Sequence, residues 1–182
     1  MAPVIKNEAF PTIGILGAGQ LGRMTACAAL RMGCQVRLLT PKPTGAMQGV
    51  GQATVGDWTD AAVLRGFADQ CDVLTLENEW APIDEMEAVR PPDTDLWPRP
   101  HTLEVIRHKG VQNDTLRDAG LPLPDYERCE TLQQARDAAE SLGYPVVVKK
   151  YTRAYDGYGN AFAENAEDVE NAWEELADED GL

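Results

Sequence analysis

The sequence predicts an α/β fold in which a mostly parallel sheet is covered by crossover helices. Short apolar runs of strand character alternate with segments of helical periodicity, and a glycine-rich loop joins the first run to the first helical segment. This alternation is typical of parallel sheets, because a parallel crossover needs a connection long enough for a helix. The 182 residues, 43% of them apolar, suffice for one good-sized domain or for one domain and part of another.

The first unit is predicted to contain four strands and two helices. The strands are expected at residues 12–16, 35–40, 53–55 and 72–76, and the helices at residues 21–32 and 60–70. In the first helix, Leu21, Met24, Ala28 and Met32 recur at helical spacing, and Gly33 follows as a natural C-terminal stop. Strand, glycine loop and helix therefore follow one another directly at the start of the chain.

A smaller second unit is predicted after a proline-rich stretch. Prolines at positions 91, 92, 98 and 100 exclude helix interiors, so the first unit is expected to span residues 1–98. A connecting helix (102–119) and a linker occupy residues 99–124, and the second unit spans residues 125–182. Its strands are expected at residues 126–129, 145–150 and 160–163, and its helices at residues 132–142 and 167–176. Because three short strands and two helices bury little surface, an incomplete domain is expected.

Charge and cysteine content exclude several classes of protein. Thirty acidic residues against sixteen basic ones give a net charge of −14, which repels nucleic acids and anionic membranes. No window approaches eighteen consecutive apolar residues, and the first residues lack a secretory signal, so the protein is expected to be cytoplasmic. The four cysteines form no CxxC pair and no cluster with histidine, which indicates neither a disulfide framework nor a zinc site.

The loop from Gly17 to Gly22 matches the GxGxxG pattern between a strand and a helix. Its glycines permit close backbone approach, and the helix N-terminus offers free amides to an anion such as a phosphate. The alternative is a tight turn with no ligand. NAD is disfavoured because the second strand ends at Thr40 without a carboxylate for the ribose, whereas Arg37 or Lys42 could serve the 2′-phosphate of NADP.

Two further segments carry candidate binding groups. Glu77 and Glu79 follow the fourth strand at a spacing of two, so both could face the crevice at the end of the sheet and accept hydrogen bonds from a sugar, or could form a solvated strand end. Lys149 ends a buried-looking strand, and a loop with two glycines, residues 155–159, follows it. A lysine on a rigid strand beside such a loop suits a nucleotide phosphate, although a plain hairpin explains the loop as well.

Four runs in this order carry a family resemblance. They are Gly14-Ile-Leu-Gly-Ala-Gly-Gln-Leu-Gly-Arg-Met24, Thr75-Leu-Glu-Asn-Glu79, Gly143-Tyr-Pro-Val-Val-Val-Lys149 and Tyr155-Asp-Gly-Tyr-Gly159. With them the chain resembles, from about Ile13 to Leu176, the N-terminal half of the 5-(carboxyamino)imidazole ribonucleotide synthetases, which are ATP-grasp enzymes of purine biosynthesis. The resemblance implies a Rossmann-like pre-ATP-grasp domain followed by an incomplete first lobe of an ATP-grasp fold (α+β).

The resemblance also implies an activity and its ligands. In the family, ATP phosphorylates bicarbonate to carboxyphosphate, and the amine of aminoimidazole ribonucleotide captures the carboxyl group. ATP and magnesium are the implied cofactors, and the implied partners are the small molecules aminoimidazole ribonucleotide, bicarbonate and ATP; the oligomeric state is left open, with a homodimer as one expectation. The magnesium ligands are expected outside these 182 residues, so this chain alone is expected to hold no catalytic residue and no metal ligand and to be inactive.

Position by position, the resemblance implies two groups of binding residues. Those for the ribonucleotide are Gly17, Gly19, Gln20, Leu21, Gly22 and Glu77. By similarity to a related ATP-grasp transformylase, Gln20 and Leu21 would face the ribosyl phosphate and Glu77 the ribose hydroxyls. Those for ATP are Lys109, Lys149, Ala154, Tyr155, Asp156, Gly157, Tyr158, Gly159 and Asn160. Tyr155 and Asp156 are also expected near the imidazole.

The second loop departs from the family pattern. Where the family usually reads Gly-Gly-Tyr-Asp-Gly-Lys-Gly-Gln, this chain begins with Arg153 and Ala154 and has Tyr158 in place of a cation. Asn113 also stands where a further lysine is common. Two other hypotheses therefore stay open, a non-catalytic ribonucleotide-binding module and an NADP-binding Rossmann protein.

Overall fold

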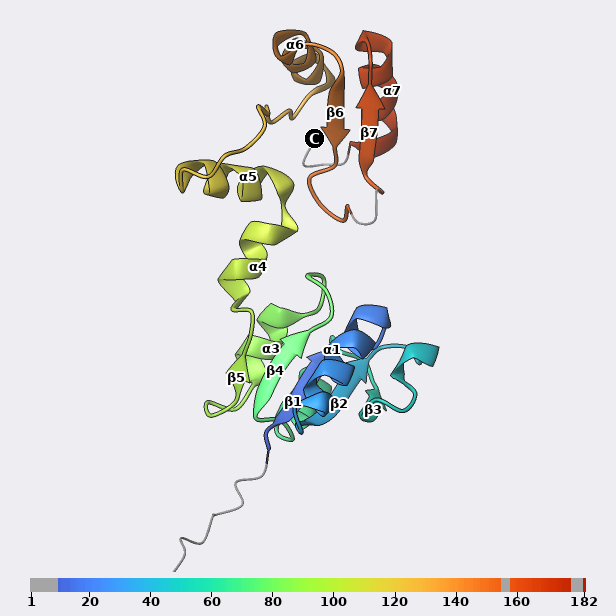
Figure 1. The fold of residues 1–182 in the computed structure, drawn as a ribbon, viewed down its shortest axis with the longest axis vertical. Coiled ribbons are helices and arrows are strands. Elements are labelled where there is room, and N and C mark those ends of the chain that lie inside the picture. The colour runs from blue at the N-terminus through green and yellow to red at the C-terminus, as the bar shows by residue number, and fades with distance from the viewer. Residues whose placement is uncertain (1–9, 155–157, 178–181) are drawn as a thin grey trace, which may run out of the picture. The chain divides into compact units, whose positions relative to one another are not determined.

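A computed structural model describes residues 10–154, 158–177 and 182. The chain divides into two compact units, Met1–Thr102 and Leu103–Leu182. Figure 1 shows both, and each is described here by itself. No helix among the described residues is long and apolar enough to cross a membrane.

The first unit is built on a five-stranded parallel sheet. Its strands are β1 (Thr12–Leu16), β2 (Gln35–Thr40), β3 (Gln52–Val55), β4 (Val73–Leu76) and β5 (Asp95–Leu96). Their order is β3-β2-β1-β4-β5, and every neighbouring pair is parallel. This is the order of the doubly wound sheets, in which ligands bind beyond the carboxyl ends of the central strands.

Helices connect these strands, as the alternation of patterns predicts. They are α1 (Gln20–Arg31), α2 (Ala61–Ala68), α3 (Ile83–Val89) and the short 3-10 helix η1 (Gly45–Met47), with α4 (Pro100–Arg107) at the division between the units. The central strands are buried over Ile15, Leu16, Leu38 and Leu74, which have no exposed surface.

Helix α1 packs through small residues rather than through its large apolar ones. Gly22, Ala26 and Ala29 are buried, whereas Leu21 is 57% exposed and Met24 is 66% exposed. A Cβ on Gly22 would lie 3.0 Å from the carbonyl oxygen of Gly17, so the glycine allows the helix to approach its own loop closely. The periodicity thus predicts the helix, but its large apolar residues face outward in this unit.

The second unit consists of a two-stranded antiparallel sheet and three helices. The strands are β6 (Val146–Lys149) and β7 (Asn160–Ala163), and the helices are α5 (Lys109–Asp118), α6 (Leu132–Leu142) and α7 (Ala166–Leu176). Cys129, Ala135, Ala139, Ala163 and Val169 form its buried core between the sheet and the helices α6 and α7 (Figure 1). On the other face of the sheet the register partners Val147 and Phe162 are 54% and 62% exposed.

Two predicted elements are wrong, and two elements of the structure are not predicted. The single helix expected at residues 102–119 is interrupted at His108, which has extended dihedral angles and caps α5. Residues 126–129 form no strand of the sheet; instead Cys129 exchanges two backbone hydrogen bonds of 2.8 Å with Leu182. Strand β5 and helix α3 lie in the stretch for which no element is expected, because β5 has only two residues and α3 only seven.

Candidate functional site

The glycine loop of the first unit is built around the side chain of Glu77. The backbone amide of Glu77 donates to the carbonyl of Leu16 over 2.8 Å, which places its side chain beside the loop that follows β1. The amide of Gly19 then donates to Glu77 Oε2 over 2.8 Å. Because this acceptor is a carboxylate, the hydrogen bond is of the stronger, charge-assisted kind.

Two glycines of the loop are required by this carboxylate. A Cβ on Gly19 would lie 2.4 Å from Glu77 Oε1, and a Cβ on Gly17 would lie 2.5 Å from both the Cβ and Oε2 of Glu77. Gly17 also has φ of +114°, a backbone conformation that L side chains rarely adopt. The GxGxxG pattern therefore accommodates a carboxylate of the protein itself, at the place where a dinucleotide fold would accept a pyrophosphate.

The loop after β2 closes a further side of this site. The hydroxyl of Thr44 donates to the carbonyl of Ala18, and one guanidinium nitrogen of Arg23 donates to Ala46 O over 2.8 Å and to Gln48 O over 2.7 Å. Sequence reasoning missed both side chains. The position of Arg23 directly after the glycine motif could have marked it as a candidate. Its acceptors, however, are backbone carbonyl groups, which no sequence motif reveals.

The structure thus brings together the residues expected to bind the ribonucleotide. Gly17, Gly19 and Gly22 surround the Glu77 carboxylate, and Gln20 and Leu21 form the first turn of α1. The first amides of a helix have no intrahelical acceptor, so this turn can offer N–H groups to an anion.

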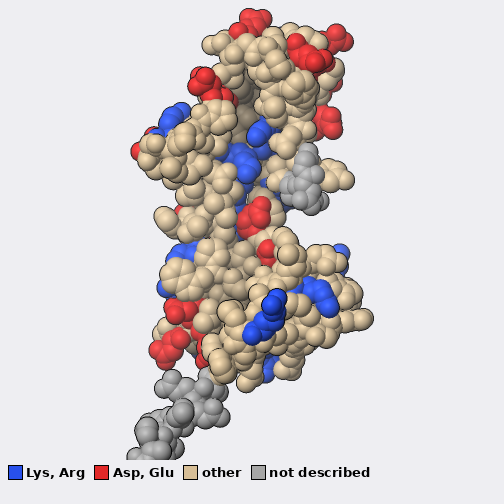
Figure 2. All heavy atoms as spheres, in the orientation of Figure 1, with Lys and Arg blue, Asp and Glu red and all other residues tan. Residues whose placement is uncertain are grey.

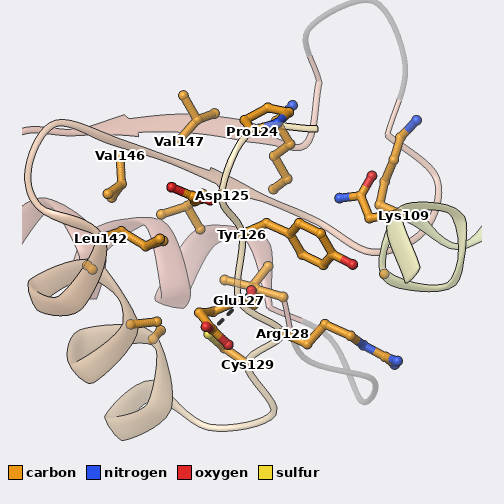
Figure 3. Close-up of a pocket in the computed structure, with 18 of the residues that line it drawn as sticks. Lys109, Pro124, Asp125, Tyr126, Glu127, Arg128, Cys129, Leu142, Val146 and Val147 are labelled. Atoms are coloured by element: carbon orange, nitrogen blue, oxygen red, sulfur yellow. Dashed lines mark hydrogen bonds between the residues drawn. The ribbon is translucent and has the colours of Figure 1, made fainter. Parts of the chain in front are cut away.

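Three of the residues expected to bind ATP line an open pocket of about 710 Å³ in the second unit, whereas Ala154, Tyr158 and Gly159 are not part of its lining. Lys109 from the start of α5 and Lys149 from the end of β6 line it, together with Asn160, the register partner of Lys149. Leu142 and Val146 supply an apolar wall (Figure 3). A cationic end and an apolar wall in one pocket suit a ligand with phosphate groups and an apolar ring.

Lys109 is held at the N-terminus of α5 by both its backbone and its side chain. Its amide donates to Tyr151 O over 2.8 Å, and its ammonium donates to Gln112 Oε1 over 3.2 Å. The side chain of His108 caps the helix by accepting a hydrogen bond from the amide of Val111.

An ion cluster holds the adjacent segment against α5. Asp114 accepts hydrogen bonds from the hydroxyl of Tyr126 and from the guanidinium groups of Arg117 and Arg128, over 2.8 to 2.9 Å. The Tyr126 hydroxyl and the Arg128 guanidinium hold the pKa of Asp114 below its usual range. One carboxylate against two guanidinium groups leaves this cluster with a net positive charge. Figure 2 shows Lys and Arg side chains gathered at the hollow of this unit and acidic side chains at its outer rim.

Part of the predicted phosphate-covering loop is described. The amide of Lys150 donates to Gly159 O over 2.8 Å, which closes the loop at its base. Gly159 has φ of +81°, and a Cβ there would lie 2.9 Å from the Cβ of Ala154. Arg153 adopts φ of +54°, a left-handed conformation that glycine adopts without strain. Asn160 begins β7 and Tyr158 lies two residues before it, whereas Tyr155, Asp156 and Gly157 lie outside the described residues.

Among the described residues, no group of three or more His, Cys, Asp or Glu side chains is arranged to hold a metal ion. Burial raises the pKa of the Cys129 thiol, which lines the pocket, and so disfavours its thiolate.

Comparison with known proteins accounts for both units. The family model of the ribonucleotide synthetase preATP-grasp domain matches residues 10–107, more than half of the chain, and the model of the ATP-grasp domain matches residues 114–182. The N5-carboxyaminoimidazole ribonucleotide synthase of Pseudomonas aeruginosa is 32% identical over 164 residues, which cover 90% of this chain and 45% of the relative. The synthase of the same name from Mycobacterium tuberculosis is 32% identical over 178 residues, with 97% and 42% covered.

Solved structures agree with these relatives. The carboxyaminoimidazole ribonucleotide synthase of Aspergillus clavatus, complexed with ATP, superposes with a TM-score of 0.79 at 31% identity, covering 93% of this chain and 45% of that one. An ADP complex of an N5-carboxyaminoimidazole ribonucleotide synthetase gives a TM-score of 0.78 at 30% identity, with 89% and 43% covered. The chain spans about 45% of the length of these relatives and matches their N-terminal half. It belongs to the family of ribonucleotide synthetase preATP-grasp domains and continues into an ATP-grasp domain.

Proposed function

We propose that this chain provides the ribonucleotide site and part of the ATP site of a ligase that carboxylates aminoimidazole ribonucleotide with bicarbonate. In this proposal residues 1–98 bind the ribonucleotide, residues 125–182 contribute to the ATP site together with Lys109, and residues 99–124 connect the two parts. The observation that carries the proposal is the Glu77 carboxylate, held by the glycine loop beside the N-terminus of α1. A second structure from Aspergillus clavatus, which aligns at 28% identity over 93% of this chain, contains ADP and 5-aminoimidazole ribonucleotide.

The ribonucleotide is recognised by two kinds of group. Glu77 keeps one oxygen on the amide of Gly19, and its remaining acceptor positions are available for the ribose hydroxyls. The amides of Gln20 and Leu21, at the positive end of the α1 dipole, bind the 5′-phosphate. This assignment places the sugar beside Glu77 and the phosphate at the first turn of α1.

The lysines of the second unit bind the phosphate groups of ATP. In the proposed reaction a bicarbonate oxygen attacks the γ-phosphorus and ADP departs, which yields carboxyphosphate. The amine of aminoimidazole ribonucleotide then attacks the carboxyl carbon, phosphate departs, and the amine loses a proton. Lys109 and Lys149 stabilise the negative charge of the phosphate groups, together with residues 154–160 of the loop.

Magnesium is the cation that phosphoryl transfer from ATP commonly requires. The residues described by the structure hold no cluster that fits it, so none of these residues is assigned as a metal ligand. We further infer a cytoplasmic protein that binds small molecules and no nucleic acid, because its net charge of −14 repels phosphate backbones. A homodimer stays a proposal.

The same geometry argues against a dinucleotide. The amide of Gly19, which would face a pyrophosphate in a dinucleotide site, already donates to the Glu77 carboxylate. A pyrophosphate at that place would meet a negative charge. NADP is therefore expected not to bind.

Titration of the 182-residue chain with aminoimidazole ribonucleotide, followed by NMR, tests the proposal. Glu77→Ala is expected to lower the affinity at least tenfold, because a hydrogen bond to a charged group is worth about 1.5–3 kcal/mol. Glu79→Ala, two residues further on, serves as the matched control and is expected to change the affinity less than twofold. Equal affinities of the parent and the Glu77→Ala variant would refute the ribonucleotide site. Binding of the ribonucleotide without any binding of ATP would instead support a binding module.

A further inference from the structure

The two lysines of the pocket lie on different elements, and a buried tyrosine that closely follows one of them in the chain contacts the element of the other. Lys149 ends β6, Lys109 begins α5, and Tyr151 follows Lys149 by two residues. The side chain of Tyr151 is almost fully buried, with 4% of the residue exposed. Packing of α5 itself is sparse, because Gly110 is its one buried residue.

Tyr151 contacts the start of α5 through its backbone and through its ring. Its carbonyl accepts the hydrogen bond from the amide of Lys109 over 2.8 Å. Its ring stacks on the imidazole of His108, the capping residue of α5, with centroids 4.5 Å apart and an angle of 27°. The tyrosine therefore contacts both the capping residue and the first residue of the helix.

The hydroxyl of Tyr151 anchors the ring from the opposite side. It accepts a hydrogen bond of 2.9 Å from the amide of Cys129. The guanidinium of Arg128 lies 5.6 Å from the ring centroid, and its Nε would be 2.8 Å from a Cβ on Gly110. The ring is thus fixed between α5 and the segment before α6, while its backbone continues from β6.

We propose that Tyr151 is a positioning residue, which holds Lys109 at a fixed place relative to Lys149. Two ammonium groups that face one pocket repel each other, so a contact that fixes their backbones prepares the site for a polyphosphate. The ligand class, a nucleoside triphosphate, rests on the proposed function. The positioning itself rests on the contacts of Tyr151.

Three variants separate the parts of this contact. Tyr151→Leu removes the ring and the hydroxyl, and Tyr151→Phe removes only the hydroxyl. Tyr144→Phe is the matched control, because the buried hydroxyl of Tyr144 has no hydrogen-bond partner in the described part of the chain. Hydrogen exchange of the Lys109 amide, measured by NMR without ligand, is expected to be at least tenfold faster in Tyr151→Leu, about threefold faster in Tyr151→Phe and unchanged in Tyr144→Phe.

A double-mutant cycle with Lys109→Ala measures whether Tyr151 acts through Lys109. Tyr151→Leu is expected to lower the affinity for ATP about tenfold in the parent chain and less than twofold in the Lys109→Ala background. An equal loss in both backgrounds would overturn the proposal, since a merely structural effect does not depend on Lys109.

The ligand-free measurement keeps the two proposals distinguishable. If the parent chain binds no ATP and the Lys109 amide still exchanges faster in the Tyr151 variants, the positioning stands and the proposed ATP site fails. Unchanged exchange of the Lys109 amide in a folded Tyr151→Leu variant overturns the positioning whether or not ATP binds. If the leucine variant does not fold, the phenylalanine variant decides: unchanged exchange there has the same meaning.

Discussion

Replacing Gly19 by alanine tests directly whether the glycine loop is shaped by Glu77. Gly19 has φ of −86° and ψ of −158°, close to extended backbone, so this position does not need the left-handed conformation that favours glycine. The obstacle is the side chain of Glu77, whose Oε1 would lie 2.4 Å from the added Cβ. The carboxylate must then either remain in an overpacked site or turn away and lose its hydrogen bond to the Gly19 amide.

Either response costs about 1–3 kcal/mol of unfolding free energy, from overpacking or from the lost bond to a charged group. Glu77→Ala loses the same hydrogen bond and is expected to cost a similar amount. The double variant loses the bond once and has no clash. It should therefore be about 1–3 kcal/mol more stable than the sum of the single effects predicts.

Gly17→Ala provides the matched control. A Cβ on Gly17 would lie 2.5 Å from the Cβ of Glu77, an atom that Glu77→Ala retains, and Gly17 has φ of +114°. Glu77→Ala removes only the clash with Oε2, also at 2.5 Å, and leaves the Cβ clash and the backbone strain, so a smaller rescue than at Gly19 is expected at this position. The assay is urea unfolding followed through the amide signals of β1, which report the first unit. Additive effects of Gly19→Ala and Glu77→Ala would refute the reasoning.

Three further predictions concern single side chains. Burial raises the pKa of Cys71 from 9.0 to about 11. The neutral, buried thiol therefore contributes to the free energy of unfolding in full below pH 9, and this contribution is lost as the pH rises through 11. At roughly 1.4 kcal/mol per pKa unit this amounts to about 3 kcal/mol, and urea midpoints of Cys71→Ala should fall correspondingly less between pH 8 and 11 than those of the parent. Arg153→Gly should raise the stability of the second unit by about 0.5–1 kcal/mol in thermal unfolding. Glycine adopts the left-handed conformation without strain, and the strain relieved exceeds the backbone entropy that glycine loses on folding. A loss of stability would contradict this. Thr131→Ala should lower the stability of the second unit by about 1 kcal/mol in the same assay, since Thr131 and Gln134 cap α6 with reciprocal hydrogen bonds. Gln133→Ala is the control.

Elements specified by local patterns could be predicted from the sequence. The strands 12–16, 35–40 and 160–163 and the helix 132–142 have the predicted bounds in the structure. Apolar runs mark the central strands, and a capping pair and a following glycine mark the two ends of the helix. The order of elements also predicts the parallel sheet, because each crossover is long enough for a helix.

The remaining features depend on distant groups. The break at His108 is stabilised by the carbonyl of Tyr151, more than forty positions away in the sequence, and β5 pairs with β4 over only two residues. Periodicity contains no information on such pairings. For the same reason the sequence indicates Glu77 as a candidate but does not reveal that its partner is the Gly19 amide, or that Arg23 fixes the loop after β2.

The glycine motif and Glu77 are best understood as one structural unit. In a dinucleotide fold the glycines make room for a pyrophosphate, whereas in this chain they make room for a carboxylate that follows β4. A negative charge at that place repels phosphate and accepts hydrogen bonds from hydroxyl groups, and for this reason we propose that the sugar of the ligand lies beside Glu77 and its phosphate at the first amides of α1. A GxGxxG loop therefore indicates the class of its ligand only when the residue after the fourth strand is known, because that side chain decides whether the space inside the loop is available to a phosphate.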